Sequence, residues 1–417
     1  MGEIMLGYMM LALFFVTFSM LANRVANSVV TAPMAFLGFG ALLAGLGMVP
    51  DEGSERALHL VTEIALIILL FFDAAKIDQG ALLRRNVWPR RMLAIGMPLG
   101  FLIGTMLAWL LLPAWPLALA ALAAAILLPT DVALGQPVIT NVAIPDRPRR
   151  AITVESGLND GLALPLVLLM AALAAPGGMD PGGGWLLFGL KQVTLGPLMG
   201  GAIGTIGGFA LLWAKRTRST ADIHEGIGAL ALAALAYLTA TTIGGNGFIS
   251  AFVAGLGFGA VVRGRCAFVY EFTESEGQLL SWTAFLLLGA VLVPQAAADL
   301  TLGSLAFILA CLLIVRPLAI WVSLIGTDAK PVTRIFLGWF GPRGLATALF
   351  ALLVFEQLEP GSGEYILHLA VNAVWISAIL HGVSAGPVAR WYARRLGQDA
   401  SEGPIGSASP RNAGARE

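Results

Sequence analysis

An aspartate and two prolines interrupt an apolar run in the stretch LLPTDVALGQP, residues 127–137. A second apolar run is interrupted in a similar way in GWFGPRGLATAL, residues 338–349. A proline removes a backbone donor and clashes with the preceding helical turn. Both helices are therefore expected to break, one beside Asp131 and the other beside Arg343. Transporters use such interrupted helices to bind ions in the middle of the membrane.

The two interruptions are separated by 343 − 131 = 212 residues. The same offset relates Asp160 to Asn372, and the two interrupted spans are expected to run in opposite directions. This is the signature of two inverted-topology repeats with discontinuous crossing helices. The predicted organisation is one transmembrane domain, 1–396, with repeats at about 1–175 and 223–396 and a connecting span at 184–213.

The composition is that of an all-α polytopic membrane protein. Of the 417 residues, 58% are hydrophobic and only 12% are charged, and the mean hydropathy is +0.83. Soluble domains carry about 25% charged residues, so most soluble enzymes are excluded. The formal net charge of zero leaves no basic excess for nucleic acid. Two cysteines, Cys266 and Cys311, are too few for a disulfide framework or a metal cluster.

About thirteen segments are long and apolar enough to span a bilayer, which takes roughly 17 to 25 residues. The first segment follows MGEIM, whose acid replaces the basic start of a signal peptide, so we expect a permanent span. The segments lie at about 4–22, 31–49, 57–76, 92–112, 117–141, 151–175, 184–213, 223–243, 246–262, 278–296, 301–326, 332–358 and 365–389.

Most cations fall in one set of alternate connections, including 76–91, 147–150, 215–218 and 390–395. Positive charge marks the cytoplasmic side, so the sequence predicts a multi-pass protein of the cell (inner) membrane with its N-terminus outside and its C-terminus in the cytoplasm. The acidic run EFTESE, residues 271–276, is expected to be a cytoplasmic loop. The Gly/Ser/Ala/Pro-rich tail, 397–417, is expected to be disordered.

Charges at bilayer depth are costly and mark functional sites by default. The helical rise places four of them about 15 Å deep, near the middle of a ~30 Å core: Asp131, Asp160, Arg316 and Arg343. Glu155 lies about half as deep on the helix of Asp160. The two carboxylates are about 140° apart around that helix, so different partners are expected for them.

Two further acids, Asp73 and Glu63, occupy the third span. Asp73 lies near its inner end and is expected at a cytoplasmic mouth, whereas Glu63 lies in the outer half and is interpreted as structural. His381, in the last span, is interpreted as an ordinary interfacial histidine.

Charge bookkeeping suggests a mechanism. Three acids, Asp131, Glu155 and Asp160, face two cations, Arg316 and Arg343, which leaves one carboxylate uncompensated. An unpaired buried carboxylate takes a proton unless a cation replaces it. A site that must hold either H⁺ or a metal ion is an exchanger.

Four motifs in this order and spacing resemble the monovalent cation/proton antiporters, in particular the class of NhaP-type antiporters and animal sodium/proton exchangers. They are PTD at 129–131, ESGLND at 155–160, VRPLA at 315–319 and FGPRG at 340–344. The resemblance extends over residues 57–390 and implies the fold shared by NhaA, NapA and NhaP antiporters. It also implies a homodimer in which a six-helix core moves against a dimerisation domain.

The resemblance implies roles for individual residues. Asp160 is similar to the essential ion-binding and proton-accepting carboxylate, so Na⁺ would bind at Asp160 and Asp131. Thr130 and Ser156 would contribute ligand or supporting oxygens, although each hydroxyl could instead bond to a carbonyl one turn back. The adjacent Asn159 is typical of members with electroneutral one-for-one exchange.

Three further roles follow from the same resemblance. Glu155 and Arg316 resemble the buried ion pair of the family. Arg343 would compensate the crossing of the broken helices, and Asp73 would belong to the cytoplasmic ion path.

The sequence therefore favours exchange of Na⁺ or Li⁺ for H⁺ by alternating access, in contact with membrane lipid and with no cofactor. A K⁺/H⁺ antiporter of the same fold is the nearest alternative. A cation channel or a proton-conducting subunit is a further one. An intramembrane hydrolase that uses Asp131 and Asp160 is a third, and the accompanying arginines argue against it.

Overall fold

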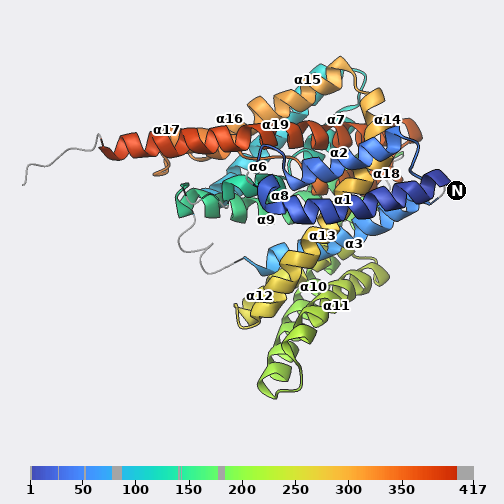
Figure 1. The fold of residues 1–417 in the computed structure, drawn as a ribbon, viewed down its shortest axis with the longest axis vertical. Helices are drawn as coiled ribbons and strands as arrows, with labels where there is room; N and C mark the ends of the chain where they lie inside the picture. Colours follow the sequence, from blue (N-terminus) through green and yellow to red (C-terminus); the bar gives the residue numbers. More distant parts are fainter. Residues whose placement is uncertain are drawn as a thin grey trace, which may run out of the picture.

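The structure is a computed structural model that describes residues 2–26, 28–50, 53–77, 87–139, 141, 143–176 and 184–401. Within these ranges the regular structure is entirely helical (Figure 1). The helices are α1 (Gly2–Ala26), α2 (Ala32–Gly45), α3 (Ser54–Ala75), α5 (Val87–Arg91), η1 (Met92–Gly96), α6 (Met97–Leu111), α7 (Leu117–Ile126), α8 (Val132–Ile139), α9 (Asp146–Ala174), α10 (Gly184–Arg216), α11 (Asp222–Thr242), α12 (Gly247–Val262), α13 (Ala267–Val291), α14 (Val293–Ala298), α15 (Leu302–Ala310), η2 (Cys311–Val315), α16 (Arg316–Ser323), α17 (Pro331–Trp339), α18 (Leu345–Phe355) and α19 (Pro360–Ser401).

Each of the thirteen predicted spans corresponds to one helix or to consecutive helices. By length and composition alone, eight helices of the described chain could cross a membrane. The other predicted spans lack one long continuous apolar helix: α2 and α12 are short, and the spans that contain α7, α13 and α17 are each divided into two helices. The all-helical polytopic fold predicted from composition is confirmed.

Two predictions about boundaries need correction. Residues 271–276 were expected in a loop but belong to α13, which begins at Ala267. Polar side chains can continue a helix beyond the membrane because water satisfies their charges. Helix α19 runs to Ser401, past the predicted start of the tail at 397. The rest of the tail, 402–417, and Arg84 and Arg85 of the predicted cytoplasmic set lie outside the described residues.

The two proline-interrupted stretches are extended breaks inside the membrane domain. Residues 127–131 separate α7 from α8, and residues 340–344 separate α17 from α18. The backbone N–H of Asp131 donates to the carbonyl of Pro342 over 2.8 Å, so the two breaks cross and bond to each other. The predicted discontinuous crossing helices are confirmed.

A second repeated feature was missed by the sequence analysis. Helices η1 and η2 are π-helical turns that precede Pro98 and Pro317. These prolines are 317 − 98 = 219 residues apart. A proline cannot donate to the preceding turn and clashes with it, and a widened turn accommodates this defect. The matched turns provide independent support for inverted repeats.

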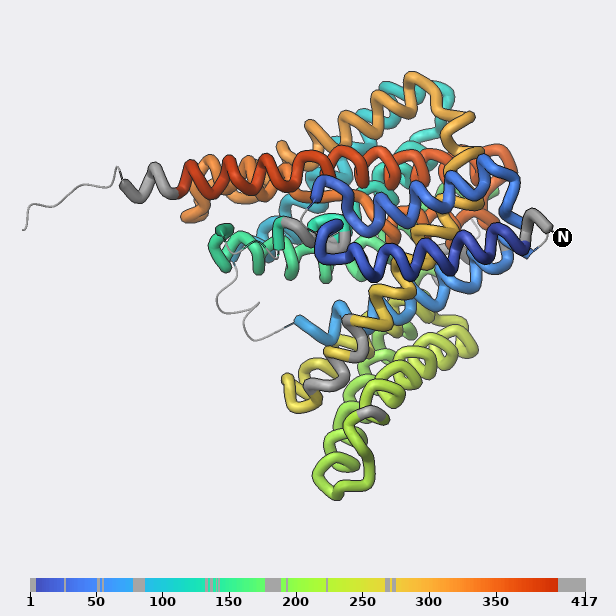
Figure 2. The backbone as a smooth tube through the Cα atoms, in the orientation of Figure 1, coloured from blue at the N-terminus to red at the C-terminus, as the bar shows by residue number. Residues whose placement is uncertain are grey.

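The helices are divided into two groups, and the tube view shows α10–α12, in green to yellow, projecting from the rest of the bundle (Figure 2). The core group comprises α5–α9 with η1, and α15–α19 with η2; the scaffold group comprises α1–α3 and α10–α14. In the scaffold group α12 packs on α3 and α10, and α13 packs on α2. In the core group α7 packs on α9, and α18 packs on α19.

Glycines allow the closest approach within the scaffold group. A Cβ atom at Gly255 of α12 would lie 1.9 Å from the carbonyl oxygen of Phe71 in α3, and one at Gly259 would lie 2.2 Å from that of Ala75. Small residues at membrane helix interfaces let backbones pack together in this way.

A polar cluster ties three core segments together at the end where α5, α9 and α17 begin. Arg147 pairs with the carboxylate of Asp328, which also accepts a 2.9 Å hydrogen bond from the indole of Trp88. The guanidinium of Arg147 lies 3.9 Å from the centre of the Trp88 ring. The hydrogen bond from Arg147 holds the pKa of Asp328 below its usual range.

Candidate functional site

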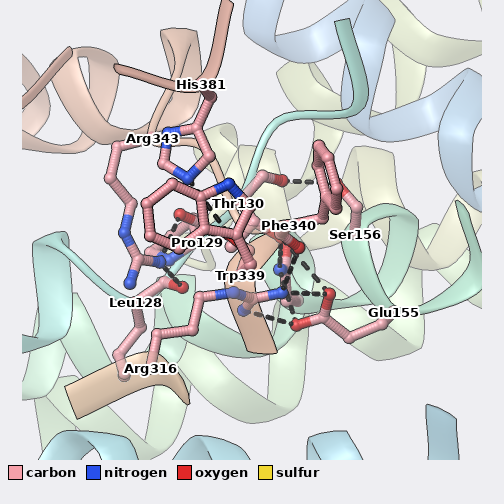
Figure 3. Close-up of polar contacts among 11 residues, drawn as sticks. Leu128, Pro129, Thr130, Glu155, Ser156, Arg316, Trp339, Phe340, Arg343 and His381 are labelled. Atoms are coloured by element: carbon pink, nitrogen blue, oxygen red, sulfur yellow. Dashed lines mark hydrogen bonds and ion pairs between the residues drawn. The ribbon is translucent and has the colours of Figure 1, made fainter. Parts of the chain in front are cut away.

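The crossing of the broken helices is stabilised by two reciprocal caps, of which Figure 3 shows the one made by Arg343. The guanidinium of Arg343 donates from Nη1 to the carbonyls of Leu128 and Pro129, which follow the end of α7; the Pro129 bond is 3.0 Å long. The Asp131 carboxylate accepts a 3.0 Å bond from the backbone N–H of Leu345, the first residue of α18. A cation at the C-terminus of a helix and an anion at its N-terminus both interact favourably with the helix dipole. Each repeat thus supplies the charge that caps the other.

Two glycines of the FGPRG stretch make room for these charges. A Cβ atom at Gly344 would lie 1.9 Å from Oδ2 of Asp131, and one at Gly341 would lie 1.5 Å from Nε of Arg316. Any larger residue would displace a buried charged group from its partners. The glycines of this stretch are therefore required by the site itself as well as by the break in the helix.

Beside the crossing, Glu155 of α9 and Arg316 of α16 form a buried bidentate ion pair. Their two hydrogen bonds are 3.1 Å (Nη1 to Oε1) and 3.0 Å (Nη2 to Oε2). Nη2 also donates to the carbonyl of Phe340, at the end of α17, over 2.9 Å. Arg316 therefore balances the charge of Glu155 and caps a half-helix as well. Figure 3 shows the two side chains facing each other.

Three neutral side chains connect α9 to the first break. Asn159 donates from Nδ2 to Thr130 Oγ1 over 2.6 Å and to Glu155 Oε1 over 3.4 Å. Ser156 donates to the backbone carbonyl of Thr130. The Asn159 amide thus donates to both the Thr130 hydroxyl and the Glu155 carboxylate and holds them in place. Ser156 keeps lone pairs that could face a cation.

Asp160 lies one helical turn beyond Ser156 in α9, on the same face. Its Oδ1 atom is buried and has no hydrogen-bond partner among the described residues. The negative charges of Asp131, Asp73 and Glu155 all act on it. A buried carboxylate oxygen surrounded by like charges is stabilised by any added positive charge, whether a proton or a metal ion.

The structure therefore brings the predicted residues of the fifth, sixth, eleventh and twelfth spans to one place. Asp73 belongs to α3 of the scaffold group and approaches these residues from outside the core group. A Cβ atom at Gly157 of α9 would lie 3.8 Å from the backbone carbonyl oxygen of Asp73. Glu63, also in α3, lies apart from the site and accepts a 2.5 Å hydrogen bond from the hydroxyl of Tyr237.

His381 belongs to the crossing, so its interpretation as an interfacial histidine was wrong. It is buried in α19, where Nε2 lies 3.1 Å from the carbonyl of Trp339 and Nδ1 lies 3.1 Å from the hydroxyl of Ser377. The Ser377 hydroxyl accepts a 2.7 Å bond from the backbone N–H of Arg343. Nδ1 also lies 3.0 Å from the backbone carbonyl of Ser377, so each ring nitrogen faces a carbonyl to which it can donate. The only sequence signal was its position in the middle of an apolar span.

A cation at this site would be coordinated by a mixed set of oxygens. The available groups are the Asp160 carboxylate, the Asp131 carboxylate, the Ser156 hydroxyl and the Thr130 hydroxyl or carbonyl. In the described part of the chain, His, Cys, Asp and Glu side chains form no group of three or more that could hold a metal ion. Few charged ligands suit reversible binding of a hard, weakly charged cation.

Comparison with known proteins finds relatives whose sequences are similar to this one over most of its length. The K(+)/H(+) antiporter NhaP2 of Shewanella oneidensis is 30% identical over 391 residues, which cover 88% of this chain and 65% of the relative. The K(+)/H(+) antiporter NhaP of Alkalimonas amylolytica is 30% identical over 370 residues, which cover 86% of this chain and 62% of the relative. The chain thus spans about two thirds of the length of these curated relatives.

The fold matches a solved structure, that of the sodium proton antiporter MjNhaP1 from Methanocaldococcus jannaschii. The TM-score is 0.77 at 20% sequence identity, with 94% of this chain and 99% of the other covered. The family model described as "Sodium/hydrogen exchanger, transmembrane" matches residues 9–391. The interrupted helices, the central ion pair and this match lead to one conclusion: the chain belongs to the sodium/hydrogen exchanger family.

Proposed function

We propose that this protein exchanges a monovalent cation for a proton across a membrane, with both ions competing for Asp160. The observation that carries the proposal is the buried Oδ1 of Asp160, which has no hydrogen-bond partner in the described part of the chain. The negative charges of Asp131, Asp73 and Glu155 act on this carboxylate. In a low-dielectric site this carboxylate needs one positive charge in every state. A proton and a cation can each supply it, but not together.

In this proposal the other charged side chains at the crossing keep the same partners throughout transport. Glu155 and Arg316 neutralise each other, while Asp131 and Arg343 cap opposite half-helices. Asn159 carries an amide where a second carboxylate would add another titrating group. One exchanging site with one compensating charge supports electroneutral one-for-one exchange.

Alternating access is the proposed mode of transport, with the core group moving against the scaffold group. Helix α9 carries Asp160 and meets the scaffold through glycines: a Cβ atom at Gly161 would lie 2.5 Å from the ring of Phe252 in α12. The close approach at Gly161 brings α9 directly against the scaffold group, where the proposed movement would take place. We further propose a homodimer in the cell (inner) membrane, N-terminus outside, as the family resemblance and the charge distribution suggest.

The transported cation is tested by a screen in proteoliposomes that carry a pH-sensitive dye. We expect addition of K⁺ to dissipate an imposed pH gradient, because the relatives with 30% identity are named K(+)/H(+) antiporters. A larger response to Na⁺ or Li⁺ would instead support the selectivity predicted from the sequence.

Each cation is added at equal ionic strength, with choline as the inert control. Proton flux that proceeds without any permeant cation would contradict exchange and indicate a channel. Gradients that no monovalent cation dissipates would contradict the proposed function itself.

A further inference from the structure

A large groove lies on the core group away from the ion site. It has a volume of about 910 Å³ and runs between η1, the adjoining ends of α5 and α6, and one face of α9. Apolar side chains form most of its wall, among them Ile95, Phe101 and Leu162. Its volume is within the ~300–1,000 Å³ of typical ligand pockets.

One end of the groove is basic. Arg90 and Arg91, the last two residues of α5, line it there. Nε of Arg91 is buried and has no hydrogen-bond partner among the described residues. Guanidinium groups donate charge-assisted hydrogen bonds to phosphate oxygens, so an anionic group placed at this end of the groove would be favoured.

The groove is separate from the ion site. Its α9 wall consists of Leu158, Leu162 and Leu166, which recur every four residues on one face. Asp160 lies about 160° around the helix from Leu162. A ligand in the groove would therefore contact the helix that carries Asp160 without reaching the carboxylate.

The groove is also positioned to face the membrane. Leu162 and Ile95 have 48% and 39% of their surface exposed within the chain, and both belong to helices apolar enough to cross a bilayer. The arginines are the last two residues of the positively charged connection 76–91, which is predicted to be cytoplasmic. Basic pockets between membrane helices on that side suit anionic lipid headgroups.

We propose that this groove binds an anionic glycerophospholipid of the adjacent leaflet. The phosphate of the headgroup lies against Arg90 and Arg91, and an acyl chain follows Phe101 and Leu162 into the groove. Both parts of the site are needed: the arginines select the negative headgroup, and the apolar wall retains the chain.

The test measures lipid binding to the full-length protein purified in detergent, by native mass spectrometry. Phosphatidylglycerol is compared with phosphatidylcholine of the same acyl chains. We expect phosphatidylglycerol to bind more tightly, and Arg90→Gln/Arg91→Gln to lose that preference by roughly tenfold, given the attraction of two cations for one anion. Leu162→Trp, which fills the groove, should weaken binding of phosphatidylglycerol while both arginines remain.

A charge-matched control is Arg216→Gln/Arg265→Gln, which removes two exposed arginines outside the groove: Arg216 is the last residue of α10, and Arg265 follows α12. It should retain the preference for phosphatidylglycerol. Equal binding of the two lipids, or equal loss in both double variants, would overturn the proposal. Competition by glycerol phosphate as strong as that by phosphatidylglycerol would also overturn it, because the apolar groove would then have no part.

Discussion

Asp160→Asn is expected to abolish cation-dependent proton exchange, reducing it to the background of protein-free liposomes. Asparagine has nearly the same shape as aspartate, but its side-chain amide neither ionises nor takes up a proton near neutral pH. The variant therefore keeps the packing of α9 while replacing a buried carboxylate whose Oδ1 atom has no hydrogen-bond partner among the described residues. The measurement is dissipation of a pH gradient by K⁺ or Na⁺ in proteoliposomes.

The control is Asp222→Asn, at the start of α11. Its side chain is 78% exposed and lies 3.7 Å from Lys215, so exchange should be unchanged. Both variants should elute as monodisperse protein and unfold within a few degrees of the wild type. A folded Asp160→Asn protein that still exchanged cations for protons would show that another group carries the ions.

Arg316→Met is expected to destabilise the protein by about 3–5 kcal/mol, because it leaves the buried carboxylate of Glu155 without its cation. The side chains of Arg316 and Glu155 are only 7% and 5% exposed, so water cannot replace the lost partner. The carbonyl of Phe340 would lose its 2.9 Å hydrogen bond as well. The measurement is the thermal unfolding midpoint in detergent.

The double variant Glu155→Gln/Arg316→Met tests the cause of that loss. It contains no unpaired buried charge at this position, so it should be more stable than Arg316→Met alone. Arg150→Ala provides the surface comparison, since Arg150 is 75% exposed and lies 3.9 Å from Asp146; its effect should be within about 0.5 kcal/mol. A double variant no more stable than the single one would contradict an electrostatic role.

Much of the site could be predicted because its chemistry is concentrated in a few polar residues of an apolar chain. The prolines beside Asp131 and Arg343 located both breaks, and their spacing indicated inverted repeats. Helical geometry separated Glu155 from Asp160, and the structure accordingly gives them different surroundings. Buried charges in a membrane are too costly to be accidental, so they are informative in sequence.

The remainder depends on contacts between distant segments. The cap that Asp131 provides to Leu345 bridges 214 residues, and no local pattern distinguishes such a cap from an ion ligand. The position of His381 at the crossing was not predicted, because its contact with Trp339 joins α19 to α17. Its other partner, Ser377, lies one turn earlier on α19. The π-helical turns had a local signal, a proline two residues after each, but that signal also fits an ordinary kink.

The reciprocal caps also explain why the crossing contains both signs of charge. The two breaks run past each other, and each exposes one positive and one negative helix end. Asp131 and Arg343 together neutralise one such pair of ends. The charges of the crossing are therefore balanced without Asp160, as the proposed exchange of ions at Asp160 requires.

The pH dependence of apparent cation affinity tests the shared site most directly. If a proton and a cation compete for Asp160, the cation concentration that gives half-maximal exchange should rise as pH falls. In the range where the proton occupies most sites, it should rise by about tenfold per pH unit, while the maximal rate at saturating cation stays constant. An apparent affinity that does not change with pH would contradict competition at Asp160.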